Sequence, residues 1–380
     1  MEFKVSAKAL YSTLSGVSKV INSKNTLMIL DNFLLKVEDN LLVVTASDTE
    51  NTLVARLALA EVEGSGSVCV NARRLADIAK ELPDVDVTFS VNDETLAIKI
   101  SFPGGAFDLV GIDANQYPAT GVDAADEDEG PVSDLLLPAS QILHGIDNTF
   151  FAVGSDSLRP QMTGIFWDVK KDGITFVATD TRKLVRYVDK TSEPGVETSC
   201  IIPQKPCVIL KNLLSDGEDV KVRMTSKSAT FATEHITLNC RFIKGNFPDY
   251  NRVIPKNNPN EVTVDRVTLL TAIRRVSVCA DPSHGLVKLR FNPGQIELKV
   301  DDANFSTFAF EKVACDYQGR EDLVIGFSST YLIEIFNTID TDNVIIRLAD
   351  PARPGVFLPE ENEENTELVI ILMPMSVQDF

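Results

Sequence analysis

The sequence has none of the long hydrophobic runs that cross a membrane. No apolar stretch approaches the roughly 18 residues that a membrane-spanning helix needs. The opening MEFKVSAKAL shows no basic start followed by an apolar segment, so we expect no signal peptide. Six cysteines are scattered over 380 residues without a CxxC pair, which argues against a zinc or redox motif. We expect small buried cysteines in a reducing, cytoplasmic protein without membrane contact.

Catalytic motifs are missing as well. The three histidines lie far apart, and no GxSxG, HExxH, GxGxxG or phosphate-binding GxxxxGKS/T pattern occurs. Asp48 and Asp180 occupy matching positions after strand-like runs, but each precedes a threonine, which is typical of a turn capped by the carboxylate. We therefore expect no catalytic residues, no metal and no cofactor. An enzyme that uses scattered carboxylates without a familiar motif stays open as an alternative.

The balance of charge is strongly acidic, with 36 Lys and Arg against 55 Asp and Glu and a net charge of −19. A nucleic-acid-binding protein usually shows a basic surface instead. Much of the acid lies in two runs, 123–130 and 359–367, which are typical of solvated loops. The charge sum alone does not settle what the protein binds.

What the sequence does contain is a threefold repeat. Apolar residues at helical spacing begin at Leu10, Ile142 and Leu269, which are 132 and 127 residues apart. Each such helix is followed by an alternating, hairpin-like stretch. In the first two repeats this stretch ends in nearly the same phrase, VVTASDTENTLV (43–54) and FVATDTRKLV (176–185).

A second helix closes each repeat. Short strands run into helices in VCVNARRLADIAKEL, CIIPQKPCVILKNLL and VIGFSSTYLIEIFNTI, with Asn71 and Ser328 as expected N-caps and Pro206 in a first helical turn. A β-rich run follows each helix. The pattern predicts three similar α+β domains of ordinary size. We place them at residues 1–124, 125–256 and 257–380, with boundaries in turn-rich or acidic segments.

Positive charge is concentrated on the six expected helices. They carry ten basic and five acidic residues, so they sum to +5 and the remainder of the chain to −24. Helix propensity alone does not explain this, because Glu forms helices as readily as Lys and Arg. If the helices share one face, that face suits the phosphates of nucleic acid without reading bases. The helices are expected at 6–22, 71–82, 138–153, 205–214, 265–280 and 328–339.

Four segments stand out along the chain, in the order TLMILDNFLLKV, VATDTRKL, GNFPDYNRVIPK and ILMPM. Together they resemble the bacterial sliding clamp family, the β subunit of DNA polymerase III. The resemblance implies the DNA clamp fold: a head-to-tail dimeric ring with helices inside and antiparallel sheets outside. It further implies a processivity factor that encircles duplex DNA, independent of sequence, and tethers the replicative polymerase. Lys24 corresponds to a basic DNA contact of the family, and the helix charges add Arg73, Lys205, Arg274 and Arg275.

The resemblance also implies a hydrophobic pocket for short peptide motifs. Its occupants would be the polymerase α subunit, the clamp loader, and repair and translesion polymerases. Carried over by position, the pocket residues are Met162, Thr179, Thr181, Arg182, Leu184, Pro248, Arg252, Val253, Ile371, Met373, Pro374 and Met375. Flexible methionines suit several partners. This chain departs from the family where Thr181, Arg182 and Lys183 replace Gly-His-Arg, and where Ser376 and the tail to Phe380 follow ILMPM.

Dimer contacts follow from the same resemblance. The first domain of one copy is expected to meet the third domain of the other through an apolar centre with a charged rim. The residues implied are Arg74, Ile78, Phe107, Leu109, Val278 and Cys279. A repeat scaffold that binds only proteins stays open as a further alternative, and it predicts no effect from replacing the basic helix residues.

Overall fold

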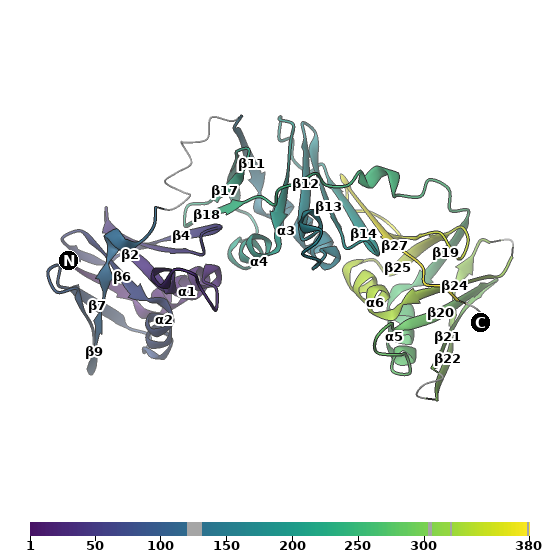
Figure 1. Cartoon of the computed structure of the whole chain (residues 1–380), viewed down its shortest axis with the longest axis horizontal. Helices are drawn as coiled ribbons and strands as arrows, with labels where there is room; N and C mark the ends of the chain where they lie inside the picture. The colour runs from purple at the N-terminus through teal and green to yellow at the C-terminus, as the bar shows by residue number, and fades with distance from the viewer. Residues whose placement is uncertain (120–130, 303–305, 320, 378–379) are drawn as a thin grey trace. The chain divides into compact units, whose positions relative to one another are not determined.

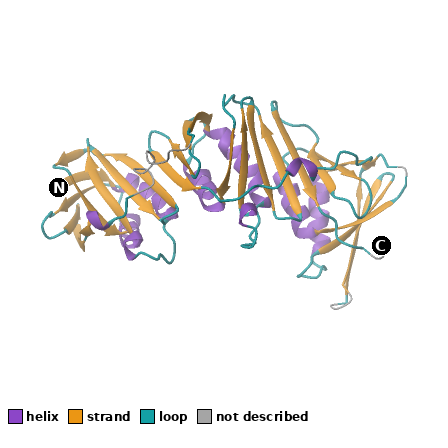
Figure 2. Ribbon diagram, turned by 45° about the horizontal axis from the view of Figure 1, so that its top comes forward, coloured by secondary structure: helices purple, strands orange, loops and turns teal. Residues whose placement is uncertain are grey.

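The threefold repeat predicted from the sequence is confirmed in the computed structural model, shown by chain position in Figure 1 and by secondary structure in Figure 2. The expected domain boundary at 124/125 and the acidic run before Gly130 lie outside the described residues, as do two residues of the C-terminal tail. The structure describes residues 1–119, 131–302, 306–319, 321–377 and 380.

Each repeat contains two α-helices and two groups of strands in the same order. The first repeat is built from β1 (Glu2–Ser6), α1 (Ala7–Val17), η1 (Ser18–Val20), η2 (Met28–Asp31), β2 (Asn32–Glu38), β3 (Leu41–Ser47), β4 (Asn51–Ala58), β5 (Glu61–Glu63), β6 (Gly66–Asn71), α2 (Ala72–Glu81), β7 (Asp86–Val91), β8 (Ala97–Phe102), β9 (Gly105–Val110), β10 (Ile112–Asp113) and η3 (Ala114–Gln116).

The second repeat keeps this order without the small strands. Its elements are β11 (Ser133–Pro138), α3 (Ala139–Thr149), η4 (Phe150–Ala152), η5 (Pro160–Met162), β12 (Gly164–Lys170), β13 (Gly173–Thr179), β14 (Lys183–Asp189), β15 (Thr198–Pro203), α4 (Gln204–Leu213), β16 (Asp219–Met224), β17 (Ser228–Ala232), β18 (Ile236–Arg241) and η6 (Tyr250–Arg252).

The third repeat completes the chain. It consists of β19 (Asn260–Asp265), α5 (Arg266–Ser277), β20 (Leu286–Asn292), β21 (Gln295–Asp302), β22 (Thr307–Ala314), β23 (Asp316–Tyr317), β24 (Leu323–Ser328), α6 (Ser329–Thr338), β25 (Asn343–Leu348), β26 (Gly355–Pro359) and β27 (Thr366–Leu372). The six α-helices of the described residues lie inside the expected helical segments or within one residue of them.

Three helices of the described residues begin with a side-chain cap, whereas Ser328, the cap expected for α6, occupies the N-cap position without a capping hydrogen bond from its side chain. The side chains of Ser6, Asn71 and Asp265 each accept a backbone N–H from the first helical turn, at 3.4, 3.0 and 2.7 Å. Such a cap stabilises a helix by about 1 kcal/mol. The apolar face then packs inward, so that Leu10 and Leu14 of α1 are fully buried. Burying one leucine contributes roughly 1.5–3 kcal/mol.

The chain forms two compact units, each of which contains strands from two repeats. One unit comprises residues 1–140 and 205–242, and the other comprises 141–204 and 243–380. The second repeat is divided between the units because its two groups of strands belong to different sheets. In each unit, strands of two repeats join into one nine-stranded sheet, in the orders β10-β6-β2-β3-β4-β18-β17-β16-β11 and β15-β12-β13-β14-β27-β26-β25-β19-β23.

The two joints between repeats have the same register. In the first joint Leu53 of β4 lies opposite Leu238 of β18, and in the second Val185 of β14 lies opposite Ile370 of β27. Each residue of the second joint follows its counterpart by 132 positions. All four side chains are fully buried. A repeat is therefore joined to the next by antiparallel strand pairing that fixes both direction and register.

Among the described residues, two outer strands, β9 in the first unit and β22 in the second, have no neighbouring strand on one side. The first unit has a five-stranded sheet that ends at β9, and the second has a four-stranded sheet that ends at β22. Both edges expose large apolar side chains: Val110 is 81% exposed, Phe308 62% and Phe310 45%. Long exposed apolar edges are what proteins usually cover or avoid.

In the described part of the chain, no helix is long and apolar enough to cross a membrane. The six cysteines are all free, and four of them are buried as expected.

Candidate partner pocket and nucleic-acid interface

The turn between β13 and β14 has the geometry that its Thr-Asp phrase predicts. The Asp180 carboxylate accepts the backbone N–H groups of Arg182 and Lys183 at 2.9 and 2.8 Å, and the Thr179 hydroxyl accepts that of Thr181. Asp48 caps the corresponding turn of the first repeat. These carboxylates are turn residues, as expected. The turn leaves Thr181 and Arg182 exposed, with Thr181 at a φ of 80°.

Three of the predicted pocket residues line one small cavity. Met162, Thr181 and Arg182 surround a volume of about 170 Å³ together with residues from the loop between η4 and η5, the end of β13 and helix α6. The further lining residues are Gly154, Ser155, Asp156, Arg159, Asp180 and Tyr331. The cavity is therefore polar and holds both signs of charge.

Two further predicted residues lie in an adjoining apolar cluster. Leu184 and Ile371 face each other across the β14–β27 ladder and are buried with Val177. Half-buried aromatic residues pack against them, and the rings of Phe166 and Phe247 are stacked at 4.8 Å. Thr179 is buried and donates its hydroxyl to the backbone oxygen of Lys183.

The C-terminal segment lies beside the same turn. The backbone N–H of Met373 donates to the oxygen of Arg182 at 2.8 Å, and that of Met375 donates to the oxygen of Gly326. The Met373 side chain is 41% exposed, and Pro374 is half-buried. The strand that carries Ile371 thus continues into an accessible methionine-rich wall.

The remaining predicted residues follow the GNFPDY phrase. Pro248 is half-buried, while Arg252 and Val253 are exposed at and after η6. Their segment is held by Tyr250, whose backbone oxygen accepts the N–H of Val253 and whose ring packs on the apolar cluster. The Tyr250 hydroxyl donates to Asp168 at 3.0 Å, and burial followed by the Asp168 charge raises its pKa to about 12.

A buried lysine ties the turn to helix α6. The ammonium group of Lys183 pairs with Glu334 and lies 4.4 Å from the centre of the Tyr331 ring. A buried ammonium group is stable only when it is paired in this way. Sequence reasoning missed Tyr331 and Glu334 as neighbours of the pocket, because they lie about 150 residues from the turn and no pattern links them. Phe247 and Tyr250, by contrast, stand within the quoted GNFPDY phrase.

The five predicted DNA contacts differ in their surroundings. Lys24 and Arg73 are exposed and take part in no ion pair within the part of the chain that the structure describes. Lys205 instead donates to Asp48 at 2.6 Å. Arg274 donates to Asn337 at 3.0 Å, and Arg275 makes two hydrogen bonds to Glu311. Only the first two are available to phosphates without rearrangement.

The predicted dimer residues lie near the two unpaired edges. Arg74, Ile78 and Phe107 line one hollow of about 470 Å³ beside β9. Leu109 is on the same strand and is half-buried. On the other unit, Val278 at the end of α5 is 84% exposed, and the backbone oxygen of Cys279 accepts the hydroxyl of Thr307, the first residue of β22.

This fold is that of the three-domain sliding clamps. A crystal structure of a DNA polymerase sliding clamp from Pseudomonas aeruginosa superposes with a TM-score of 0.91 at 27% identity, covering 99% of this chain and all of that one. A clamp from Bartonella birtlesii bound to griselimycin gives a TM-score of 0.90 at 28% identity, with the same coverage.

The chain belongs to the DNA polymerase III β subunit family. Residues 1–121, 136–249 and 251–376 match the N-terminal, central and C-terminal domains of that family. Among curated relatives, the β sliding clamp of Pseudomonas putida is 29% identical over 379 residues, covering 99% of this chain and all of that protein. The β sliding clamp of Staphylococcus aureus N315 is 26% identical, with 97% and 98% covered.

Proposed function

We propose that this protein is a processivity clamp that encircles duplex DNA and tethers the replicative polymerase through its peptide pocket. The observation that carries the proposal is the three-domain clamp fold over the full chain, in a family whose members are sliding clamps. A topological tether needs only weak contacts with the phosphates, and the surplus of basic residues on the helices suits such contacts. The protein acts without catalysis, as a cytoplasmic subunit.

The pocket on the second unit is where partner peptides bind in this proposal. Its accessible Met373 and exposed Arg182 supply an adaptable apolar contact and a charged hydrogen-bond donor. Leu184 and Ile371, close along the strands to Arg182 and Met373, belong to a buried apolar cluster. The replicative polymerase α subunit, the clamp loader, and repair and translesion polymerases are the proposed partners, each through a short linear motif.

Ring closure would repeat the joint that the chain already uses twice. β9 is the third strand of the meander β7–β8–β9, and β18 is the third strand of the equivalent meander β16–β17–β18. Phe107 of β9 and Leu238 of β18 lie opposite equivalent positions of the middle strands, so Phe107 is the counterpart of Leu238. Ala309 of β22 is the counterpart of Leu53 by the same comparison. A head-to-tail copy in the common register would set Phe107 opposite Ala309 and Leu109 opposite Thr307. Phe107 and Ala309, one large and one small side chain, would together fill a volume similar to that of each of the two pairs within the chain, Leu53 with Leu238 and Val185 with Ile370.

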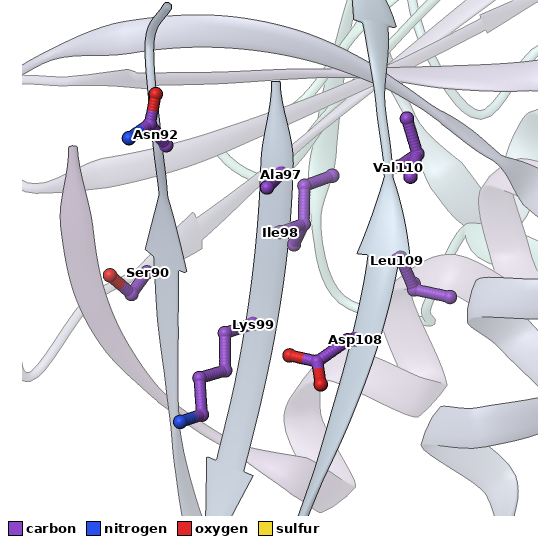
Figure 3. Close-up of a pocket in the computed structure, with 8 residues that line it drawn as sticks. All are labelled: Ser90, Asn92, Ala97, Ile98, Lys99, Asp108, Leu109 and Val110. Atoms are coloured by element: carbon purple, nitrogen blue, oxygen red, sulfur yellow. The ribbon is translucent and has the colours of Figure 1, made fainter. Parts of the chain in front are cut away.

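The outer face of β9 suits this closure. A hollow of about 440 Å³ runs along β7, β8 and β9, and Figure 3 shows Lys99 beside Asp108 with Val110 above them on the edge strand. In the common register the exposed Phe308 of the second copy would lie next to Asp108. Covering Val110, Phe308 and Phe310 would remove the most exposed apolar side chains from both edges.

Retention on DNA tests the clamp proposal directly. The protein, loaded onto a nicked circular duplex by a clamp loader, should stay bound through gel filtration and be lost after the circle is linearised. Loss at the same rate from both forms would contradict a topological tether. Hydrolysis of a polymer substrate would instead support an enzyme. No retention on either form of the DNA, with no effect of replacing Lys24, Arg274 and Arg275, would support a protein-only scaffold.

Peptide binding tests the pocket separately. A labelled peptide of the pattern Gln-Leu-x-Leu-Phe should bind at micromolar concentration, and the double variant Met373→Ala with Arg182→Ala should lose at least about tenfold in affinity. Arg241→Ala, an exposed arginine of the other unit, is the matched control and should bind as the wild type does. Equal affinity of all three proteins would place the peptide elsewhere.

A further inference from the structure

The methionine wall of the partner pocket is held at both of its ends. We use this name for Met373, Pro374 and Met375, which follow β27. The backbone N–H of Met373 donates to the oxygen of Arg182 at 2.8 Å. The N–H of Met375 donates to the oxygen of Gly326 on β24, also at 2.8 Å, and forms an antiparallel bridge with that strand. The wall therefore spans from the pocket turn to a strand of the four-stranded sheet.

Gly326 allows this close approach because it has no side chain. A Cβ atom at that position would lie 2.5 Å from the Val377 side chain, 2.7 Å from that of Leu286 and 3.1 Å from the backbone oxygen of Met375. Non-bonded carbon atoms prefer separations of roughly 3.5–4.0 Å, so no such atom fits without a shift of the chain end. Glycine inside a strand often marks the approach of another backbone in this way. The missing Cβ thus sets how closely the wall lies against β24.

Beyond the wall, the last residue of the chain is fixed to the same sheet. The centre of the Phe380 ring lies 3.9 Å from the Arg290 guanidinium carbon and 5.8 Å from the Lys299 ammonium group. Both cations are held by carboxylates of β21, Arg290 by Glu297 at 3.5 Å and Lys299 by Asp301 at 3.8 Å. An aromatic face attracts cations at these distances. The half-buried Phe380 is therefore anchored on side chains that are themselves fixed.

We propose that the chain end positions the methionine wall for partner peptides, with Gly326 and Phe380 as its positioning residues. Both lie outside the described lining of the 170 Å³ cavity. Gly326 acts through its hydrogen bond with Met375, and Phe380 acts by holding the end of the chain that continues from the wall. A wall that is already ordered spares the peptide the loss of conformational entropy that a free chain end would cost.

Peptide affinity measures the contribution of the anchor. Phe380→Leu keeps an apolar side chain but removes the ring, and it should weaken binding of the labelled Gln-Leu-x-Leu-Phe peptide to the full-length protein by roughly threefold to tenfold. The apparent affinity falls because the wall then spends only part of its time in the binding conformation. Phe380→Tyr keeps the ring and should bind as the wild type does. Leu136→Ala, an exposed leucine of the other unit, is the control and should also have no effect.

Two further variants identify the contacts. Gly326→Ala should weaken peptide binding several-fold, because the added Cβ displaces the chain at Met375. Arg290→Gln removes the cation next to the Phe380 ring and should weaken binding as Phe380→Leu does. If these two side chains act as one anchor, the double variant should lose much less than the sum of the two single losses. Additive losses would contradict the ring–cation anchor.

Hydrogen exchange tests the anchor without any peptide. In Phe380→Leu the N–H of Met375 should exchange several-fold faster than in the wild type, while that of Ile370 within β27 should not change. The melting temperature of Phe380→Leu should stay within roughly 2 °C of the wild type. Faster exchange confined to the chain end separates a positioning role from general destabilisation. Unchanged exchange at Met375 would overturn the anchor.

This inference rests on the peptide pocket proposed above, and the outcomes separate the two. A wild-type protein that does not bind the peptide would overturn the pocket, and with it the role of the chain end there. Wild-type binding that Phe380→Leu and Gly326→Ala leave unchanged would overturn the positioning role alone. An equal loss in Phe380→Tyr and Phe380→Leu would do the same for the aromatic anchor.

Discussion

Replacing Lys205 should destabilise the unit formed by residues 1–140 and 205–242 rather than weaken DNA binding. We choose Lys205→Met, which keeps the length of the side chain but removes its charge. The variant loses the hydrogen bonds from the Lys205 ammonium group to the Asp48 carboxylate and to the Asn22 amide oxygen, which measure 2.6 and 2.7 Å. Each hydrogen bond to a charged group contributes about 1.5–3 kcal/mol. Asp48 would remain buried without its counter-charge.

Two features reduce the expected loss. The Lys205 side chain is 30% exposed, so water screens the pair and solvates part of the ammonium group. The Asp48 carboxylate also keeps the backbone N–H groups of Glu50 and Asn51, at 3.0 and 2.7 Å. We therefore expect a loss of about 2 kcal/mol, below the 3–5 kcal/mol typical of a fully buried pair. For a unit of this size that is a fall in melting temperature of roughly 4–8 °C.

Differential scanning calorimetry and urea unfolding measure this loss. Lys8→Met, an exposed lysine on α1, is the matched control and should stay within about 0.5 kcal/mol of the wild type. Adding Asp48→Asn to Lys205→Met should recover part of the stability, because it removes the unpaired charge. A Lys205→Met protein that melts like the control would refute the stabilising role of the Lys205–Asp48 pair. DNA retention should be unchanged by Lys205→Met at temperatures well below the transition.

The turn and the pocket give two further predictions. Thr181→Gly should stabilise the second unit by about 1 kcal/mol in urea unfolding, since a β-branched residue at a φ of 80° is strained; unchanged or lower stability would show that Thr181 contacts outweigh the strain. Stability should also fall between about pH 10 and 12. Over that range the unfolded Tyr250 loses its proton, while burial keeps the folded one protonated with a pKa of about 12. Tyr250→Phe should flatten this dependence in pH-resolved unfolding, and an equal slope in both proteins would contradict it.

Much of the fold could be predicted because the same order of helices and strands recurs three times along the chain. The spacing of Leu10 and Leu14 predicts a helix with one buried face, and the alternation around the Thr-Asp phrases predicts hairpins; both are confirmed. Caps such as Asn71 act within four residues of chain, so their effect is visible in sequence. The family and the three-domain fold could also be predicted, because each repeat contains at least one of the four segments that resemble the sliding clamps.

What the sequence could not supply is the pairing of groups that lie far apart. That Lys183 would meet Glu334, or that Lys205 would be engaged by Asp48, depends on the packing together of elements that lie 151 and 157 residues apart in the chain. The same pairing divides the second repeat between two sheets, which composition and spacing do not foretell. Tyr331 is a further example: it lines the pocket, but no local pattern in the sequence indicates that it does.

The sequence by itself determined the repeat, its helices and hairpins, the surplus of positive charge on the helices and the family. These follow from local spacing, capping and composition, which act over a few residues. Only the tertiary structure decided which basic residues are engaged and which are free, and where the joints lie. Those outcomes depend on distances of a few ångströms between atoms of different repeats: Lys205 lies against Asp48, whereas a cavity remains beside Asp180 and Tyr331.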